Sequence, residues 1–433
     1  IWRTTIKLKL KLFSRLLSGN VALIGDKSIS HRAIIFAALA DGKSNIQNLL
    51  MSEDTKATLK IIEQMGIDIK LNDTVSITGK GLNGLKEPKK DLNAMNSGTT
   101  ARLLIGLLSK QNFSSTLIGS PQLNKRPMNR ITDLLVQNGA SINIKNSFLP
   151  IKFKSSKYSF NFQNTLVPSA QVKSALIIAS LYHSEPTLIE ETVATRDHTE
   201  RMLIAMGANI LRLGNTITVS PTNNLKPLNI SIPGDISSGA FLIALGVLKG
   251  KEIILENMLI NERRLGFVKI LKRMGANIEI VNINEENNEV IGDIKVKKST
   301  LNGTTVTKEE VADFIDEIPI FTFLASQASG ITKLVGAEEL KVKESDRLDV
   351  MKNFILELGG KIEVYDDGFE ITGIQDLQDG FIKTFDDHRI AMTAIIANIA
   401  LGKKIIPDNR ECIKDSYPSF FQDLKELGAE INE

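Results

Sequence analysis

Two hydrophobic patterns alternate along the chain. In the first, apolar residues at helical spacing on one face are followed by a glycine and a short apolar run, which is typical of a surface helix leading into a strand. The six copies read IIEQMGIDI (61–69), LLVQNGASI (134–142), MLIAMGANI (202–210), LKRMGANIE (271–279), FILELGGKI (354–362) and DLKELGAEI (423–431). We expect left-handed glycines to end these helices, at Gly66, Gly139, Gly207, Gly275, Gly359 and Gly428.

The second pattern is a helix rich in Ala, Leu and Ile, then a polar break and a strand. It covers residues 31–46, 101–118, 172–189, 240–255, 318–334 and 389–406. These helices are apolar on most faces, so they are predicted to be buried. Because the two patterns stay in phase, the sequence predicts a helix–strand unit of about 70 residues that occurs six times.

The length and the repeats together predict two domains of three units each. Single cores stop growing at roughly 250–300 residues, and this chain has 433. Apolar stretches at 22–24 and 232–234 precede two Gly-Asp motifs, and we place the domain crossings there. One domain is then continuous (25–234), and the other combines 1–24 with 235–433.

The basic N-terminal segment has two possible explanations. A targeting peptide would be basic and poor in acids, as residues 1–20 are. Residues 6–12, however, alternate apolar and basic positions with period two, which is typical of a half-buried strand. We favour the strand.

Composition narrows the function classes. The net charge of +3 and 5% aromatic residues do not favour nucleic acid as a partner. The chain has one cysteine, Cys412, and no apolar run as long as the roughly 18–20 residues of a membrane span. Its histidines show no metal-ligand spacing. We therefore expect a cytoplasmic protein that acts on small molecules without a metal.

Polar motifs stand where the buried helices are predicted to begin. They occupy residues 25–32, 96–102, 168–173, 234–239, 313–317 and 386–389. A helix N-terminus carries unpaired N–H groups and partial positive charge, so it favours anions. Equivalent helix ends should point the same way in a repeat fold. If the two domains face each other, these ends would line one anion-binding cleft.

Helix capping is the alternative explanation for these motifs, because Ser, Thr and Asp are common N-caps. For Asp235, Ser237 and Ser238, capping and ligand binding stay equally open. Capping does not explain Lys27 and Arg32, since cations at a positive helix end are unfavourable.

Charged residues also stand where three surface helices are predicted to begin, at 125–128, 195–201 and 341–347. Taken alone, a run such as 341–347 is more typical of a solvated charged face.

Taken together, the motifs resemble the enolpyruvyltransferase family, and within it the 5-enolpyruvylshikimate-3-phosphate synthases. The matching stretches, in order, are Gly25–Arg32, Asn96–Thr100, Arg126–Met128, Ser169–Gln171, Lys343–Arg347 and Asp387–Arg389. Residues Asp26, 169–173 and 196–200 resemble the glyphosate-tolerant class of that family. The resemblance implies an α/β (α+β) fold of six βαβαββ-type units, three per domain, that closes on its substrates. It also implies transfer of enolpyruvyl from phosphoenolpyruvate to the 5-hydroxyl of shikimate 3-phosphate, in aromatic amino acid biosynthesis.

The resemblance implies a role for each matched position. Residues implied to bind shikimate 3-phosphate are Lys27, Ser28, Arg32, Ser169, Gln171, Thr195, Asp316 and Lys343. Residues implied to bind phosphoenolpyruvate are Lys27, Gly98, Arg126, Gln171, Arg347 and Arg389. We expect Asp316 to act as base and Glu344 as acid, with Lys27 as a substitute acid. We expect a monomer that needs no cofactor.

Two rival functions remain to be compared. An enzyme that transfers enolpyruvyl to a UDP-amino sugar would share the fold and the donor, but residues 103–130 lack the reactive cysteine usual in that family. A non-catalytic protein that binds RNA or another polyanion would explain clustered cations at helix starts. The low net charge and the lack of a stacking motif do not favour it.

Overall fold

The computed structural model describes residues 16–431 and divides them into two compact units. One unit comprises Gly25–Pro233 with Glu285–Glu289, and we call it the continuous unit. The other, the discontinuous unit, comprises Gly234–Asn284, the described residues from Val290 onward and those before Gly25. The strand predicted over residues 6–12 lies outside the described part of the chain.

Most of the sheets share one topology. Among the described residues, five sheets have four strands, with the first two strands parallel and the second and third antiparallel. In the continuous unit the sheets are β13 (Asn229–Ser231)–β2 (Asp41–Gln47)–β4 (Thr74–Lys80)–β3 (Asp68–Lys70), β5 (Leu92–Asn93)–β6 (Ser115–Ile118)–β8 (Phe148–Phe153)–β7 (Ile142–Lys145), and β9 (Phe162–Asn164)–β10 (Thr187–Glu190)–β12 (Thr216–Val219)–β11 (Ile210–Leu213). In the discontinuous unit they are β1 (Leu17–Ala22)–β14 (Gly250–Leu259)–β16 (Glu289–Lys297)–β15 (Asn277–Glu286), β17 (Thr305–Val306)–β18 (Gly330–Leu334)–β20 (Gly368–Gly373)–β19 (Glu363–Tyr365), and the two-stranded β21 (Gly380–Ile382)–β22 (Ile405–Pro407). The repeat predicted from the sequence is therefore the repeat of the fold.

The sixth unit departs from the prediction. A strand was expected after Gly428, but residues 429–431 form none. In the other units the strand after the surface helix pairs with the second strand of a hairpin, as β3 pairs with β4. The described residues after Gly428 include no such partner, so the apolar pattern alone does not produce a strand there.

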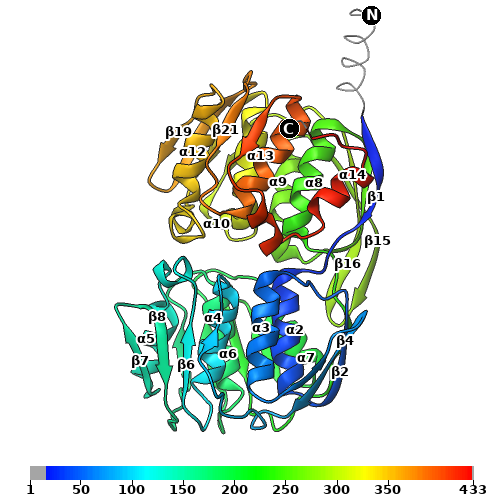
Figure 1. The fold of residues 1–433 in the computed structure, drawn as a ribbon. Helices are drawn as coiled ribbons and strands as arrows, with labels where there is room; N and C mark the ends of the chain where they lie inside the picture. The colour runs from blue at the N-terminus through cyan, green and yellow to red at the C-terminus, as the bar shows by residue number, and fades with distance from the viewer. Residues whose placement is uncertain (1–15, 432–433) are drawn as a thin grey trace, which may run out of the picture. The chain divides into compact units, whose positions relative to one another are not determined.

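The buried helices form the centre of each unit (Figure 1). They are α2 (Lys27–Leu39), α4 (Gly98–Leu108), α6 (Ala170–Ser180), α8 (Ile236–Lys249), α11 (Ile318–Ser326) and α13 (His388–Leu401). Helices α4 and α6 approach so closely that a Cβ on Gly106 would lie 2.2 Å from the Ala175 carbonyl oxygen. In the other unit α8, α11 and α13 contact one another. The predicted burial of these helices is confirmed.

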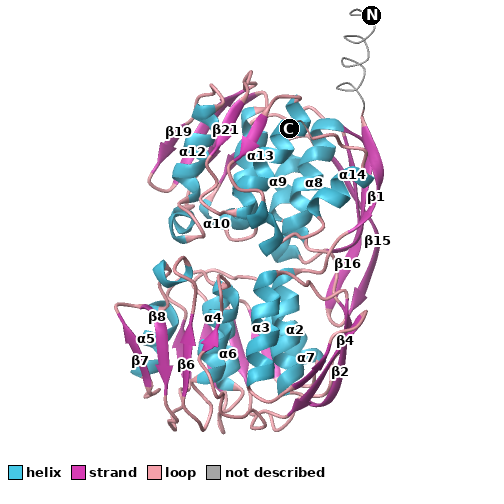
Figure 2. Ribbon diagram, in the orientation of Figure 1, coloured by secondary structure: helices cyan, strands magenta, loops and turns pink. Residues whose placement is uncertain are grey.

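The amphipathic helices cover the core of each unit, and loops connect them to the sheets (Figure 2). They are α3 (Glu53–Gln64), α5 (Asn129–Gln137), α7 (His198–Ala205), α9 (Gly266–Arg273), α12 (Arg347–Glu357) and α14 (Phe420–Glu426). The six glycines expected to follow them all have φ between 77° and 100°, which confirms their role. Shorter helical segments are α10 (Lys308–Val311), η1 (Leu123–Lys125), η2 (Glu262–Arg264), η3 (Ile315–Glu317), η4 (Glu338–Val342) and η5 (Glu411–Asp415).

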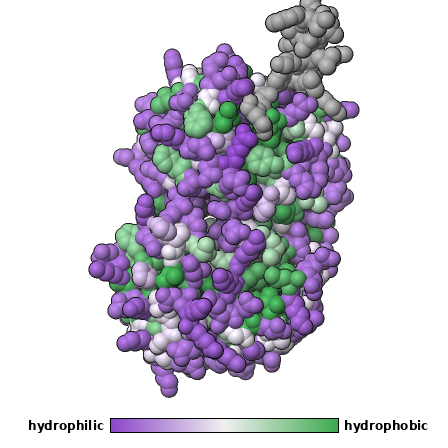
Figure 3. Space-filling view, viewed as in Figure 1, coloured by the Kyte–Doolittle hydropathy of each residue, from purple (hydrophilic) through white to green (hydrophobic). Residues whose placement is uncertain are grey.

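The surface is mixed. On the face shown in Figure 3, polar side chains predominate and apolar ones occur in small groups. Within residues 16–431, no helix is long and apolar enough to cross a membrane. The same residues contain no group of three or more His, Cys, Asp or Glu side chains that could hold a metal ion.

Candidate active site

The polar motifs do begin the buried helices, and in five of the six a side chain caps the first turn. The residues whose side chains accept an N–H of the first turn are Asp26, Ser97, Ser169, Asp235 and Asp387. Capping is thus confirmed for Asp235, which accepts from the N–H groups of Ser237 and Ser238. The cations of these motifs have other partners, which define the candidate site.

Lys27 stands in the first turn of α2. Its ammonium forms an ion pair with Asp54, a residue in the first turn of α3. Both side chains are more than four-fifths buried, which strengthens their attraction relative to a surface pair. Asp54 was not predicted as a site residue, because an acid in a first helical turn is common and needs no further explanation.

Arg32 is also buried, with 3% of its surface exposed. Its Nε donates to Thr199 Oγ1 and its Nη2 to Ser174 Oγ, both at 2.7 Å, and its Nη1 donates to the Ser28 carbonyl at 2.8 Å. The guanidinium therefore ties α2 to α6 and α7. The position of Ser28 depends in part on this contact.

His31 of the same motif belongs to the core. It is fully buried, and its Nδ1 lies 2.7 Å from Thr58 Oγ1. Burial, together with the charges of Lys27 and Arg32, holds the pKa of His31 well below its ordinary value. The imidazole therefore stays neutral between two cations.

Gly98 and Arg126 are in contact at the N-terminus of α4. A Cβ added to Gly98 would lie 2.9 Å from Arg126 Nη1 and 3.0 Å from Cζ. Only a residue without a side chain leaves the guanidinium this close to the helix end. Two positive groups, the helix terminus and the guanidinium, then adjoin each other, as binding of an anion requires.

Both polar atoms of the Gln171 side-chain amide form hydrogen bonds. Its Nε2 donates to Thr99 Oγ1 at 3.0 Å, and its Oε1 accepts from Arg102 Nη1 at 2.7 Å. These bonds join the starts of α4 and α6. From the sequence, Arg102 stood out as a cation at a helix start, but no role in the site was predicted for it.

The polar groups of Thr195 form hydrogen bonds within the protein. Its hydroxyl and its N–H both donate to Glu191, the N–H at 3.1 Å, and its carbonyl accepts from Lys173 at 3.3 Å. Glu191 was not expected at the site, because nothing in its sequence context distinguishes it.

In the discontinuous unit, Arg347 connects three carboxylates. Its Nε lies 2.9 Å from Asp387 Oδ2, its Nη2 lies 2.7 Å from Glu344 Oε2, and its Nη1 lies 3.5 Å from Asp316 Oδ1. Lys343 Nζ donates to the same Asp316 oxygen at 3.3 Å. Four predicted residues from two segments therefore form one cluster, and its fifth member is Asp387, which belongs to a matched motif but had no predicted role of its own.

The cluster shifts the ionisation of its buried members. Burial alone would raise the pKa of Asp387, but the charge of Arg347 holds it below its ordinary value. Burial would lower the pKa of Arg347, and the charges of Asp387 and Glu344 raise it instead. Both groups are therefore held in their charged forms.

Arg389 adjoins this cluster in the first turn of α13. Its backbone N–H donates to Asp387 Oδ1 at 3.0 Å, and its Nη1 lies 4.0 Å from Glu317 Oε1. The predicted residues thus gather into two groups, one in each compact unit.

Comparison with known proteins shows the family of the chain. The profile of EPSP synthase (3-phosphoshikimate 1-carboxyvinyltransferase) matches residues 14–424. The chain belongs to the EPSP synthase family. Proteins of this family are named 3-phosphoshikimate 1-carboxyvinyltransferases, after the transfer of a carboxyvinyl group in the shikimate pathway. Membership of the family therefore supports this activity and does not favour transfer to a UDP-amino sugar.

Individual members of the EPSP synthase family are similar over nearly the whole chain. The 3-phosphoshikimate 1-carboxyvinyltransferase of Oceanobacillus iheyensis is 43% identical, over 97% of this chain and 99% of its own length. That of Bacillus thuringiensis (strain Al Hakam) is 40% identical, over 95% and 97%. EPSP synthase from Acinetobacter baumannii has a solved structure with a TM-score of 0.85 and 36% identity, covering 97% of this chain and 98% of that one. An enolpyruvyl transferase of Streptomyces tendae shares the fold at 16% identity, with a TM-score of 0.76.

Proposed function

We propose that the two groups of residues together bind phosphoenolpyruvate and shikimate 3-phosphate and transfer the enolpyruvyl group between them. The observation that carries this assignment is the Arg347 cluster, where two carboxylates suited to proton transfer share one buried cation. These carboxylates are Asp316 and Glu344, and Lys343 is a second cation bound to Asp316.

Charge balance supports the division of the substrates. The two ligands bring roughly five negative charges in two phosphates and two carboxylates. We assign shikimate 3-phosphate to a group of residues drawn mainly from the continuous unit, Lys27, Ser28, Arg32, Ser169, Gln171, Thr195, Asp316 and Lys343. We assign phosphoenolpyruvate to Lys27, Gly98, Arg126, Gln171, Arg347 and Arg389. Arginine suits both ligands because its fork matches phosphate and carboxylate.

The chemistry proceeds in two proton-coupled steps. In the addition, Asp316 takes the proton of the 5-hydroxyl, whose oxygen bonds to C2 of phosphoenolpyruvate while Glu344 protonates the C3 methylene. In the elimination, the new methyl group returns a proton, the C2–O bond to phosphate breaks, and the double bond re-forms. We assign Lys27 as the substitute acid. All electrons stay within the two substrates, so no cofactor takes part.

The cellular setting is part of the same proposal. We infer a monomeric enzyme in the cytoplasm that closes on its substrates to exclude water, because phosphoenolpyruvate can be hydrolysed.

Phosphate release tests the function directly. The chain should release phosphate from phosphoenolpyruvate when shikimate 3-phosphate is added and not when a UDP-amino sugar is added. Release with the sugar alone, or salt-sensitive RNA binding without any release, would overturn the proposal.

Arg126→Ala should raise the KM for phosphoenolpyruvate by roughly tenfold or more, because it removes a charged donor beside the α4 terminus. Gly98→Ala should raise the same KM by a smaller factor, since its methyl would displace the guanidinium. Lys125→Ala, next in sequence and exposed, is the control. Unchanged steady-state constants in Arg126→Ala would remove this residue from the site.

Glyphosate should inhibit the enzyme weakly, because Asp26 and residues 169–173 and 196–200 resemble the tolerant class. The check is the inhibition constant measured against phosphoenolpyruvate. Tight competitive inhibition would show that the resemblance to that class does not extend to the inhibitor.

A further inference from the structure

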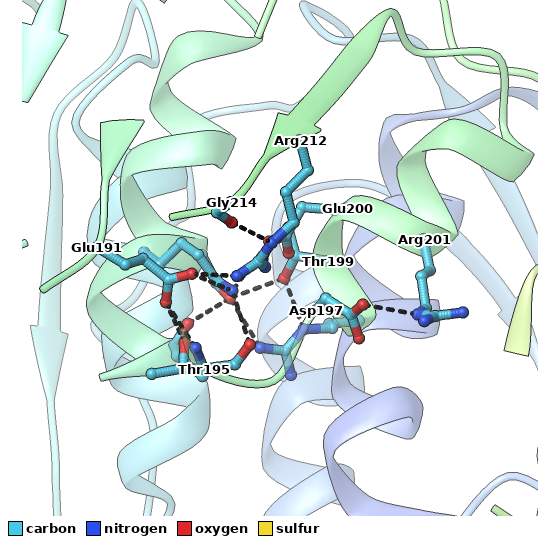
Figure 4. Close-up of polar contacts among 12 residues, drawn as sticks. Glu191, Thr195, Asp197, Thr199, Glu200, Arg201, Arg212 and Gly214 are labelled. Carbon is cyan, nitrogen blue, oxygen red and sulfur yellow. Dashed lines mark hydrogen bonds and ion pairs between the residues drawn. The ribbon is translucent and has the colours of Figure 1, made fainter. Parts of the chain in front are cut away.

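Four charged side chains, three of them buried, form a closed ring in the continuous unit (Figure 4). Lys173 Nζ lies 3.2 Å from Glu191 Oε2 and 2.9 Å from Glu200 Oε1. The guanidinium of Arg212 lies 2.9 Å from Glu191 and 3.1 Å from Glu200, which completes the ring. The side chains of Lys173 and both glutamates are at most 3% exposed, and that of Arg212 is 22% exposed.

Stability alone is a weak explanation for this ring. Taking a charge out of water has an effective penalty of several kcal/mol, which its partner only partly repays. Well-packed apolar residues of the same volume often serve stability as well or better. Two cations and two carboxylates nevertheless balance here, and the ring fixes a particular geometry. The contacts of its members show which geometry that is.

The ring holds the loop between β10 and α7 at Thr195. Glu191 accepts both the N–H and the hydroxyl of Thr195, and Lys173 donates to the Thr195 carbonyl. Each polar group of this residue is therefore bound to a member of the ring. Figure 4 shows Glu191 and Thr195 facing each other. The backbone that leads into α7 takes its position from these contacts.

The ring also adjoins the partners of Arg32. Ser174 follows Lys173 in the chain, and Thr199 precedes Glu200. The two hydroxyls lie 2.7 Å from each other, and each accepts from the Arg32 guanidinium at 2.7 Å. A shift of either ring residue would move an acceptor of Arg32.

We propose that Lys173, Glu191, Glu200 and Arg212 are positioning residues for shikimate 3-phosphate. They act through Thr195 and Arg32, and none of them is assigned a contact with the reacting atoms. The inference rests on the proposed function, which assigns these two residues to that substrate. It adds a role for a charge network that the reaction chemistry does not use.

Glu191→Gln tests the ring with little change of shape. The amide keeps one acceptor, but it leaves Lys173 and Arg212 with a single carboxylate between them. The KM for shikimate 3-phosphate should rise roughly tenfold or more, as expected from weakened charge-assisted bonds. The KM for phosphoenolpyruvate and kcat should stay within roughly threefold, because the ring binds Thr195 and adjoins the partners of Arg32, and both residues are assigned to shikimate 3-phosphate.

The control is Thr187→Val on β10, the strand that leads to Glu191. Thr187 Oγ1 lies 2.8 Å from His183 Nδ1 and donates to the Phe160 carbonyl at 3.1 Å, away from the ring. This variant should lower the melting temperature and leave both KM values unchanged. If Glu191→Gln raises both KM values to a similar extent and also lowers the melting temperature, the ring has a merely structural role and the proposal is overturned.

A second pair of variants covers the case in which Glu191→Gln does not fold. Thr199→Val removes one acceptor of Arg32, and Thr199→Ser keeps it. The first should raise the KM for shikimate 3-phosphate, and the second should restore it. Wild-type constants in Thr199→Val, or no recovery in Thr199→Ser, would contradict the proposal. A wild-type chain that binds no shikimate 3-phosphate in calorimetry would overturn the proposed function as well.

Discussion

Arg347→Met should abolish turnover and destabilise the discontinuous unit. The residue is 1% exposed and is the common partner of Asp316, Glu344 and Asp387. Removing one partner of a buried ion pair generally lowers the free energy of unfolding by about 3–5 kcal/mol, since the remaining charge stays buried. We expect at least a hundredfold loss of kcat/KM, or roughly 2.7 kcal/mol of transition-state stabilisation. Phosphate release and urea unfolding measure the two effects.

The matched control is Arg273→Met in the same unit. Arg273 pairs with Glu310 at 2.6 Å, but its side chain is 43% exposed. Exposed pairs contribute roughly 0–1 kcal/mol, so this variant should keep its activity and nearly all of its stability. Equal destabilisation by the two substitutions would show that the buried cluster has no special importance.

The pH dependence of the stability of Arg347→Met is an independent test of the cluster. In the wild type the pKa of Asp387 is lowered, so its stabilising effect is present at neutral pH and is lost as the pH falls through the folded-state pKa. Without Arg347, burial should instead raise this pKa, and protonation on acidification would then favour the folded state. The stability difference between wild type and variant should therefore narrow from pH 7 towards the ordinary aspartate pKa of about 4.

The repeat could be predicted from the sequence because each unit carries two strong local signals. An all-apolar helix and a one-sided helix with a glycine after it are readable without tertiary information, as Gly66 and Gly428 show. The sixth unit marks the limit of this reasoning. Its apolar run after Gly428 looks like the others, but a strand needs a partner strand.

The site was only partly readable, for a different physical reason. Lys27 and Arg32 stood out because cations are unfavourable at a helix start, whereas the run that contains Arg347 was, taken alone, more typical of a solvated charged face. Asp54, the partner of Lys27, and Glu191, the partner of Lys173 and Arg212, are ordinary acids at ordinary positions. Only the fold brings them within ion-pair distance, so no local pattern reports them.

Asp316→Asn should lower kcat by about 10²–10⁴, the usual contribution of a positioned base. An asparagine oxygen can still accept from Lys343 and Arg347, which reach Asp316 Oδ1 at 3.3 and 3.5 Å. The amide cannot take the proton of the 5-hydroxyl. Both KM values should therefore change little while turnover falls, a split that a folding defect would not produce.

The control for this prediction is Asp366→Asn. Asp366 accepts from Lys341 at 3.2 Å, a distance close to that of the Asp316–Lys343 pair, but its side chain is fully exposed. The Asp366→Asn variant should have the kcat of the wild type. Because Asp316 is proposed as the base, kcat of the wild type should fall at acidic pH, and Asp316→Asn should lose this fall. If kcat of Asp316→Asn stays within threefold of the wild type, the proton must go elsewhere, and Glu344→Gln then becomes the variant that decides which carboxylate accepts it.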